Sequence, residues 1–103
     1  MLVMVDIDDT ICYYDDTSKN IINYALANPY LERISKINKL YDEGHTIIYW
    51  TARGTMTGIN WFKITLNQLD KWGCKYHELR LNKPAYDLFI DDKNVTSDLY
   101  FSS

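Results

Sequence analysis

Residues 1–11 read MLVMVDIDDTI, and this stretch decides the fold because it joins a strand-type apolar run to a cluster of acids. The continuous apolar run predicts a strand over residues 1–7 that is buried on both faces, as strands of parallel sheets are. Three carboxylates, Asp6, Asp8 and Asp9, stand at its carboxyl end. Carboxylates crowded beside a core need a neutralising partner, so we expect the chemistry of this chain at the end of its first strand.

Composition narrows the class of protein. With 103 residues, of which 47% are hydrophobic and 15% aromatic, the chain is expected to form a single domain, residues 1–103, with a packed core. A net charge of −3 and 11 scattered Lys and Arg residues give no basic patch for nucleic acid. The sequence shows neither an apolar run of about 20 residues nor a signal-peptide pattern, so we expect a cytoplasmic protein without membrane contact.

Strand-type and helix-type patterns alternate along the chain. Strands are predicted over residues 1–7, 46–50, 76–79 and 87–90. One helix is predicted to start at Asn28-Pro29 and to end at Gly44, and a second to start at the cap Thr57 and to end at Gly73. This alternation favours right-handed βαβ units. The predicted fold class is therefore α/β, a Rossmann-like three-layer sandwich with a parallel sheet and helices on both faces.

Polar segments follow three of the predicted strands. They are DIDDT at residues 6–10, TARG at residues 51–54 and the acid pair at residues 91–92. In open α/β sheets, ligands bind beyond the carboxyl ends of the strands. We therefore expect these three segments to converge on one edge of the sheet and to form a single site.

The residue types in this set suit phosphoryl transfer. Asp6 and Asp8 are two positions apart and would repel each other unless a cation lies between them, and the acids at 91–92 increase the repulsion. A hard divalent cation such as Mg²⁺ resolves this, and we expect the strand end to be fully stable only with Mg²⁺ beside it. Lys83 adds a fixed cation and Thr51 a hydroxyl, which completes a set for handling phosphate.

Four motifs in this order resemble those of the haloacid dehalogenase (HAD) superfamily of phosphatases, over about residues 1 to 93. The motifs are DIDDT with Asp6, Asp8 and Thr10, a hydrophobic strand that ends in Thr51, Lys83, and FIDD with Asp91 and Asp92. The resemblance implies a Rossmann-like HAD core and a Mg²⁺-dependent phosphatase, that is, a phosphoric monoester hydrolase.

The resemblance also implies a role for each catalytic residue. Asp6 would attack phosphorus and become an aspartyl phosphate. Asp8 would protonate the leaving oxygen and then activate water to hydrolyse that intermediate. Thr51 and Lys83 would bind the transferring phosphoryl oxygens, with Lys83 also pairing with Asp6.

The implied metal site draws on both acid pairs. Asp6, Asp91 and the backbone carbonyl of Asp8 would hold Mg²⁺, and Asp92 would either be a further ligand or position metal-bound water. Asp9 fits none of these roles and is interpreted as a turn-stabilising residue.

A narrower resemblance concerns the substrate. The segments TARG, LNKPAYD and DLFIDDK are similar to those of small bacterial HAD phosphatases associated with capsular polysaccharide biosynthesis. This implies a small phosphorylated metabolite as substrate, namely a sugar phosphate or a related capsule precursor. Three residues near the site, Arg53, Tyr13 and Tyr14, are expected to contact it, since Arg can grip phosphate with two hydrogen bonds.

The spacing of the motifs leaves no room for a cap domain. About forty residues separate Thr10 from Thr51, and 31 separate Thr51 from Lys83, and predicted helices and strands occupy most of both intervals. We therefore expect a capless enzyme. Its pocket would be closed by the loop at 11–28, by the loop at 53–58, or by a neighbouring subunit in a homo-oligomer.

Three other interpretations remain open. A phospho-receiver signalling domain has similar residues, but its Lys comes last, whereas Lys83 precedes Asp91. A cysteine phosphatase is suggested by Cys74 and Arg80, which match C-x₅-R, but the intervening KYHEL has no glycine and includes the repelling acid Glu78. The third is an inactive HAD-like binding module.

Overall fold

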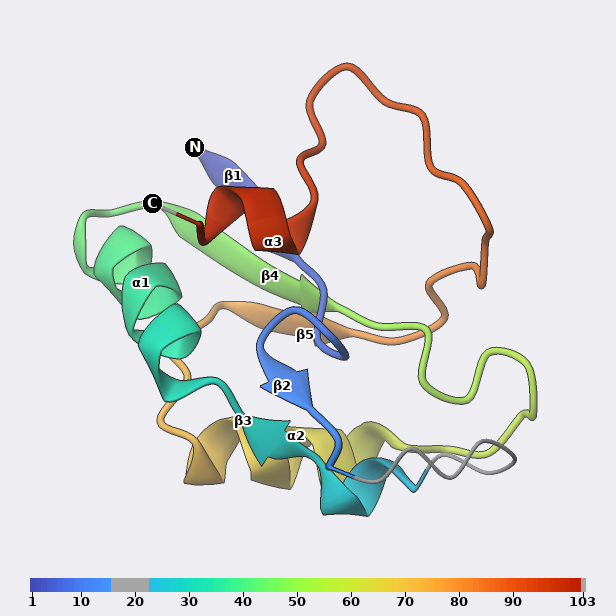
Figure 1. Cartoon of the computed structure of the whole chain (residues 1–103). Coiled ribbons are helices and arrows are strands. Elements are labelled where there is room, and N and C mark those ends of the chain that lie inside the picture. Colours follow the sequence, from blue (N-terminus) through green and yellow to red (C-terminus); the bar gives the residue numbers. More distant parts are fainter. Residues whose placement is uncertain (16–22, 103) are drawn as a thin grey trace.

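A three-stranded parallel sheet lies at the centre of the computed structural model, which describes residues 1–15 and 23–102 (Figure 1). The strands are β1 (Leu2–Val5), β4 (Thr46–Trp50) and β5 (Glu78–Arg80). Their order in the sheet is β1-β4-β5, and both pairings are parallel. The predicted α/β class with a parallel, Rossmann-like sheet is therefore confirmed.

Helices connect and flank these strands. They are α1 (Leu31–Asp42), α2 (Phe62–Lys71), the short α3 (Ser97–Tyr100) and the single 3₁₀ turn η1 (Tyr24–Leu26). Gly44 and Gly73 follow α1 and α2 with φ angles of 96° and 74°, so both predicted helix ends are confirmed by residues in the left-handed region. Among the described helices, none combines the length and the apolar character that a membrane crossing requires.

The start of α1 differs from the prediction. Asn28–Pro29 forms β3, which pairs antiparallel with β2 (Cys12–Tyr13), and the helix begins only at Leu31. The peptide N–H of Tyr30 donates to the carbonyl of Ile11, so the backbone just before the helix is already used by this small sheet. The second helix also starts later than the predicted cap Thr57, because Asn60 accepts the Phe62 N–H at its beginning.

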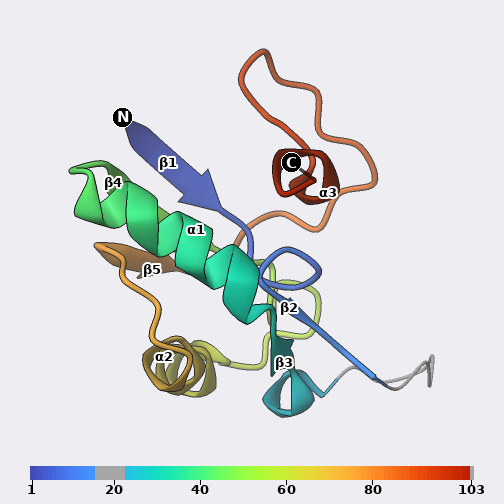
Figure 2. The same cartoon turned by 60° about the vertical axis from the view of Figure 1, so that its left-hand side comes forward.

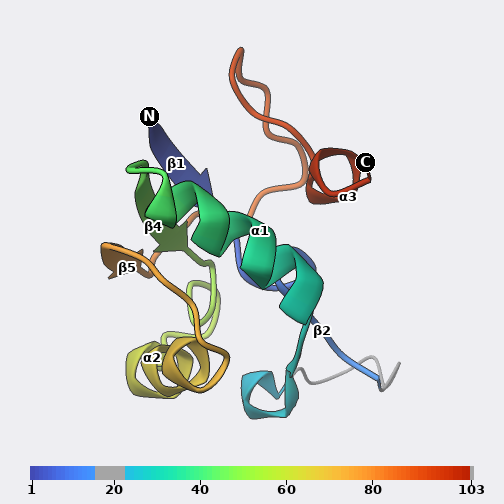
Figure 3. The same ribbon diagram turned by 90° about the vertical axis from the view of Figure 1, so that its left-hand side faces the viewer.

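One face of the sheet carries the core. Val5 and Tyr49 are register partners, and Ile47 points to the same side as Tyr49 because side chains alternate along a strand. These three side chains belong to one buried cluster with Ile34 and Ile37 of α1 and with Leu69 of α2. Both helices therefore cover the same face, and Figure 3 shows them together on one side of the strands. For these two helices the prediction of a three-layer arrangement with helices on both faces is wrong.

The opposite face of β1 is open to solvent. Leu2 is 62% and Met4 42% exposed, so the prediction that this strand is buried on both faces is wrong. The reason is the strand order. Two right-handed crossovers in the same direction, β1 to β4 and β4 to β5, place both of their helices on one side.

The predicted strand over residues 87–90 is not formed. Asn82 follows β5 with a φ of 67°, and every residue from 84 to 96 is exposed. Figures 1 and 2 show this segment, in orange, arching away from the sheet before it reaches α3. Its apolar residues Leu88 and Ile90 are 75% and 87% exposed. Within the described part of the chain, β1 therefore pairs only with β4.

A pair of Leu substitutions tests this arrangement. Leu69→Ala should lower the free energy of unfolding by about 2 to 5 kcal/mol, because Leu69 is fully buried. Leu88→Ala should change it by less than about 0.5 kcal/mol, because exposed side chains lose little on truncation. Urea denaturation measures both. A cost for Leu88→Ala similar to that for Leu69→Ala would mean that residues 87–90 are packed, against the arrangement described here.

Candidate active site

A cavity of about 510 Å³ opens where β1 and β4 end. It is lined by Asp6, Asp8, Asp9, Tyr14, Tyr24, Thr51, Ala52, Arg53 and Tyr86. The first two of the three predicted polar segments thus meet at one edge of the sheet. A volume of this size is typical of sites for small molecules.

Asp6 sits at the mouth of the cavity beside a fixed cation. Its Oδ1 lies 3.4 Å from Lys83 Nζ, and Thr10 Oγ1 donates to its Oδ2 over 3.3 Å. Burial raises the pKa of the Asp6 carboxyl, and the Lys83 ammonium opposes that rise. The Asp6 side chain keeps 37% of its surface exposed, so it can still be reached from the cavity.

Asp8 is held by a second cation, the guanidinium of Arg53. Arg53 Nη2 donates to Asp8 Oδ1 over 2.9 Å, and Nε donates to Oδ2 over 3.1 Å. Tyr14 adds a short hydrogen bond, with its hydroxyl donating to Oδ1 over 2.6 Å. Two-pronged pairs of this kind fix the direction of a carboxylate as well as its position.

Arg53 is a buried anchor rather than the expected substrate contact. Its side chain has no exposed surface. Nη1 donates to Thr65 Oγ1 over 3.0 Å and to Gln68 Oε1 over 2.6 Å, both on α2. With Asp8 on one side and these acceptors on the other, the guanidinium has no free prong to offer a substrate phosphate. Burial lowers the pKa of Arg53, but the hydrogen bonds and the opposite charge of Asp8 oppose this, and the pKa is raised overall.

Sequence reasoning missed the partners of Arg53. Thr65 and Gln68 lie on the inner side of α2, where an amphipathic pattern places apolar residues, and Thr65 is fully buried. Tyr24 places its ring 4.9 Å from the guanidinium and accepts a hydrogen bond from Gln68 at its carbonyl. A signal was present in the sequence, since two polar side chains three positions apart, and so on one face of a helix, precede the buried Leu69.

The two carboxylates therefore have separate cationic partners. Lys83 faces Asp6, and Arg53 faces Asp8. The sequence argument assigned the relief of the repulsion between these acids to Mg²⁺ and overlooked Arg53. An opposite charge within about 4 Å stabilises a carboxylate in the same way as a bound cation does.

Thr51 and its loop complete the inner wall. Thr51 is 1% exposed, and its Oγ1 accepts the Arg53 N–H over 3.1 Å. Its backbone carbonyl accepts the Lys83 N–H over 3.1 Å, so the two predicted phosphate-binding residues are directly connected. The following Gly54 has a φ of 81°, and a Cβ there would lie 2.1 Å from the Ile59 carbonyl oxygen. Only glycine fits this turn.

The other predicted site residues do not all lie at the cavity wall in the expected roles. Tyr14 lines the cavity, but Tyr13 packs its ring against Tyr30, with the centroids 4.7 Å apart, and is not part of the wall. Asp9 has a φ of 62°, and its carbonyl accepts a hydrogen bond from Ser97 at the start of α3. That geometry fits the predicted turn role of Asp9. The loop expected to close the pocket, 11–28, includes residues 16–22, which lie outside the described residues.

The second acid pair does not join the first. Asp91 and Asp92 are exposed and belong to the arching segment 84–96. Among residues 1–15 and 23–102, no three His, Cys, Asp or Glu side chains gather closely enough to hold a metal ion. In this arrangement the residues present do not fit the predicted Mg²⁺ site, because Asp6 and Asp8 supply only part of its ligands.

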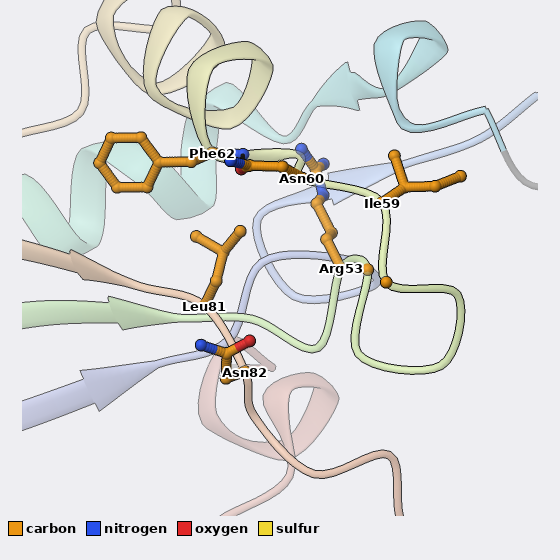
Figure 4. A pocket seen from close by; sticks show the side chains of 8 residues that line it. Arg53, Ile59, Asn60, Phe62, Leu81 and Asn82 are labelled. Atoms are coloured by element: carbon orange, nitrogen blue, oxygen red, sulfur yellow. Dashed lines mark hydrogen bonds between the residues drawn. The ribbon is translucent and has the colours of Figure 1, made fainter.

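A second cavity of about 460 Å³ lies on the other side of the Arg53 loop. Figure 4 shows Ile59, Asn60 and Phe62 above it and Leu81 and Asn82 below it, with the Arg53 side chain rising between them toward the start of α2. None of the described side chains on this wall is an acid or a nucleophile, so we place the chemistry in the first cavity.

The fold recurs in a solved structure. A crystal structure of a target protein from Vibrio cholerae matches this chain with a TM-score of 0.82 and 26% sequence identity, over 99% of this chain and 88% of that one. No protein-family model and no curated protein matches the sequence. The comparison supports the α/β fold. Together, fold and site define an α/β protein with an acidic cleft at the carboxyl ends of parallel strands, and its function has to be argued from that cleft.

The cysteines provide a test of the cysteine-phosphatase interpretation. Burial raises the pKa of both thiols, Cys12 and Cys74, to about 12, so neither forms a nucleophilic thiolate near neutral pH. We expect Ellman's reagent at about pH 8 to label both thiols quickly in concentrated guanidinium chloride and neither at a comparable rate in the native protein. Rapid labelling of native Cys74 accompanied by loss of phosphatase activity would instead support a cysteine nucleophile.

Proposed function

We propose that this chain is a phosphomonoester hydrolase of the HAD type that works through an aspartyl phosphate on Asp6. The observation that carries the proposal is the unequal environment of two carboxylates in one cavity. Asp6 is partly exposed and pairs with Lys83, whereas Asp8 is clamped by the buried Arg53. A nucleophile must reach the substrate, and a proton-transfer group must be held in a fixed direction.

The chemistry then follows in two balanced steps. An Asp6 carboxylate oxygen attacks phosphorus, the bond from phosphorus to the leaving oxygen breaks, and Asp8 gives its proton to that oxygen. A water molecule next attacks the phosphorus of the aspartyl phosphate. Asp8 takes a proton from this water, the bond between Asp6 and phosphorus breaks, and phosphate leaves with both carboxyl groups restored.

Thr51 and Lys83 are suited to bind the transferring phosphoryl group. The Thr51 oxygen already accepts the Arg53 N–H, so its own hydroxyl hydrogen is available to donate to a phosphoryl oxygen. Lys83 Nζ lies beside the attacking carboxylate and 5.5 Å from the Tyr86 ring centroid at the cavity wall. One cation near both Asp6 and the substrate would balance the charge that they bring together.

Mg²⁺ is part of this proposal as the cofactor. The Asp6 carboxylate and the backbone carbonyl of Asp8 would supply two of its ligand positions, and Asp91 with Asp92 the remainder, once the segment 84–96 brings the second pair to the site. The open edge of β1 and the exposed Leu88 and Ile90 are compatible with such a movement. No step above depends on where the metal lies.

The wall of the cavity favours a polar substrate with an apolar face. Tyr14, Tyr24 and Tyr86 line it together with the acids. Aromatic side chains beside a few polar groups suit a sugar ring, which has both kinds of surface. We therefore propose a sugar phosphate or a related precursor of capsular polysaccharide as the substrate. Closure of the site by a second copy of the chain stays a prediction.

Substitution of the nucleophile tests the activity itself. Asp6→Asn should lower kcat on a generic aryl phosphate with Mg²⁺ by at least about 10³, because an amide does not attack phosphorus. Asp8→Asn should lower it by about 10² to 10⁴ and let a phosphorylated Asp6 peptide accumulate. Asp42→Asn makes the same change at an exposed pair with Lys75, outside the cavity, and as the matched control should stay near the rate of the unsubstituted protein. Near-native turnover in Asp6→Asn would contradict the proposal.

Metal dependence tests the second acid pair. EDTA should remove activity, and added Mg²⁺ should restore it. Asp91→Asn should raise the Mg²⁺ concentration needed for half-maximal activity by about 10-fold or more, since it removes a ligand. Asp87→Asn makes the same change of charge in the same exposed segment and should leave that concentration unchanged. If both variants respond alike to Mg²⁺, Asp91 is not a ligand.

A further inference from the structure

The carboxylate of Asp8 has two oxygens with very different surroundings. Oδ1 accepts the Tyr14 hydroxyl at 2.6 Å, Arg53 Nη2 at 2.9 Å and the Cys12 thiol at 3.4 Å. Among the described residues, Oδ2 has one close donor, Arg53 Nε at 3.1 Å. Oδ1 is therefore saturated, whereas Oδ2 keeps a lone pair for another proton.

The donor that creates this difference cannot turn. The Arg53 side chain is fully buried, and its Nη1 group is fixed by hydrogen bonds to Thr65 and Gln68 of α2. Gln68 is itself held, because its amide donates to the Tyr24 carbonyl over 2.7 Å. The Tyr24 ring lies 4.9 Å from the guanidinium. Figure 4 shows the Arg53 side chain reaching from its loop toward the start of α2.

We infer that Arg53 is a positioning residue that orients Asp8 so that Oδ2 carries the proton exchanged with the leaving group and with water. The inference rests on the proposed phosphatase function and deepens it. Arg53 does not touch the substrate. It acts through Asp8, and Tyr14 assists it by holding the other oxygen of the same carboxylate.

A positioning role differs measurably from a role in folding alone. An alkyl phosphate needs its leaving oxygen to be protonated, whereas a p-nitrophenyl leaving group departs without much help from an acid. A misdirected Asp8 therefore slows phosphoryl transfer from the alkyl ester more than from the aryl ester. General damage to the fold slows both equally. The ratio kcat/KM reports the steps up to release of the alcohol, so it isolates this difference.

The experiment compares kcat/KM for p-nitrophenyl phosphate and for an alkyl phosphate in four proteins. Arg53→Lys keeps the charge but loses the fork, and it should lower the alkyl value by about 10² and the aryl value by no more than about threefold. Tyr14→Phe removes one donor to Oδ1 and should give a smaller loss with the same selectivity. Arg80→Lys makes the same exchange at an exposed pair with Glu78 and should change neither value. The unsubstituted protein is the reference.

The outcomes separate the two hypotheses. If the unsubstituted protein hydrolyses neither ester with Mg²⁺, the proposed function fails. If it is active but Arg53→Lys lowers both values equally, the positioning role is overturned and Arg53 is structural. If Arg53→Lys does not fold, as judged by circular dichroism, Tyr14→Phe decides alone. Selective loss on the alkyl ester supports the inference, and equal or no loss overturns it.

Discussion

The ion pair between Arg53 and Asp8 is the interaction on which the rest of the structure depends. Taking a guanidinium out of water costs several kcal/mol unless good hydrogen bonds compensate it. Here Asp8, Thr65 and Gln68 provide them, from the loop after β1 and from α2. Removing any one of these acceptors would leave a buried donor unpaired. The Arg53 side chain therefore both orients the site and connects it to α2.

The two long helices cover only one face of the sheet, so part of the sheet has no helix packed against it. Both long helices lie on the face that contains Val5 and Tyr49, and β1 has an open edge with the exposed Leu2 and Met4. Parallel strands are normally covered on both faces. The exposed apolar side chains of the segment 84–96 lie on the same small molecule. If the segment 84–96 docked on this edge, as the proposed function requires, it would cover both surfaces and bring the second acid pair toward the first.

Local patterns predicted the parts of the fold that depend on local physics. Strand-type runs predicted β1, β4 and part of β5, and Gly44 and Gly73 marked the ends of the two main helices. The prediction of a strand at 87–90 was wrong because a strand needs a neighbouring strand to pair with. The sequence alone does not show whether the segment reaches one. Arg53 was placed correctly at the site but given the wrong task. Its task is set by two side chains that lie 12 and 15 positions later, on α2, and the sequence does not show that they meet Arg53.

The charges in the cavity bear on the role of the proposed metal ion. Asp6, Asp8 and Asp9 line it, and Lys83 and Arg53 pair with the first two, so three carboxylates face two cations. A phosphate ester brings further negative charge, yet the Arg53 charge is already committed to Asp8. Of these two cations, Lys83 is then left to balance both Asp6 and the substrate phosphate. One positive charge does not balance two or more negative charges. The divalent cation of the proposed function would therefore serve to balance the charge of the substrate rather than that of the strand end.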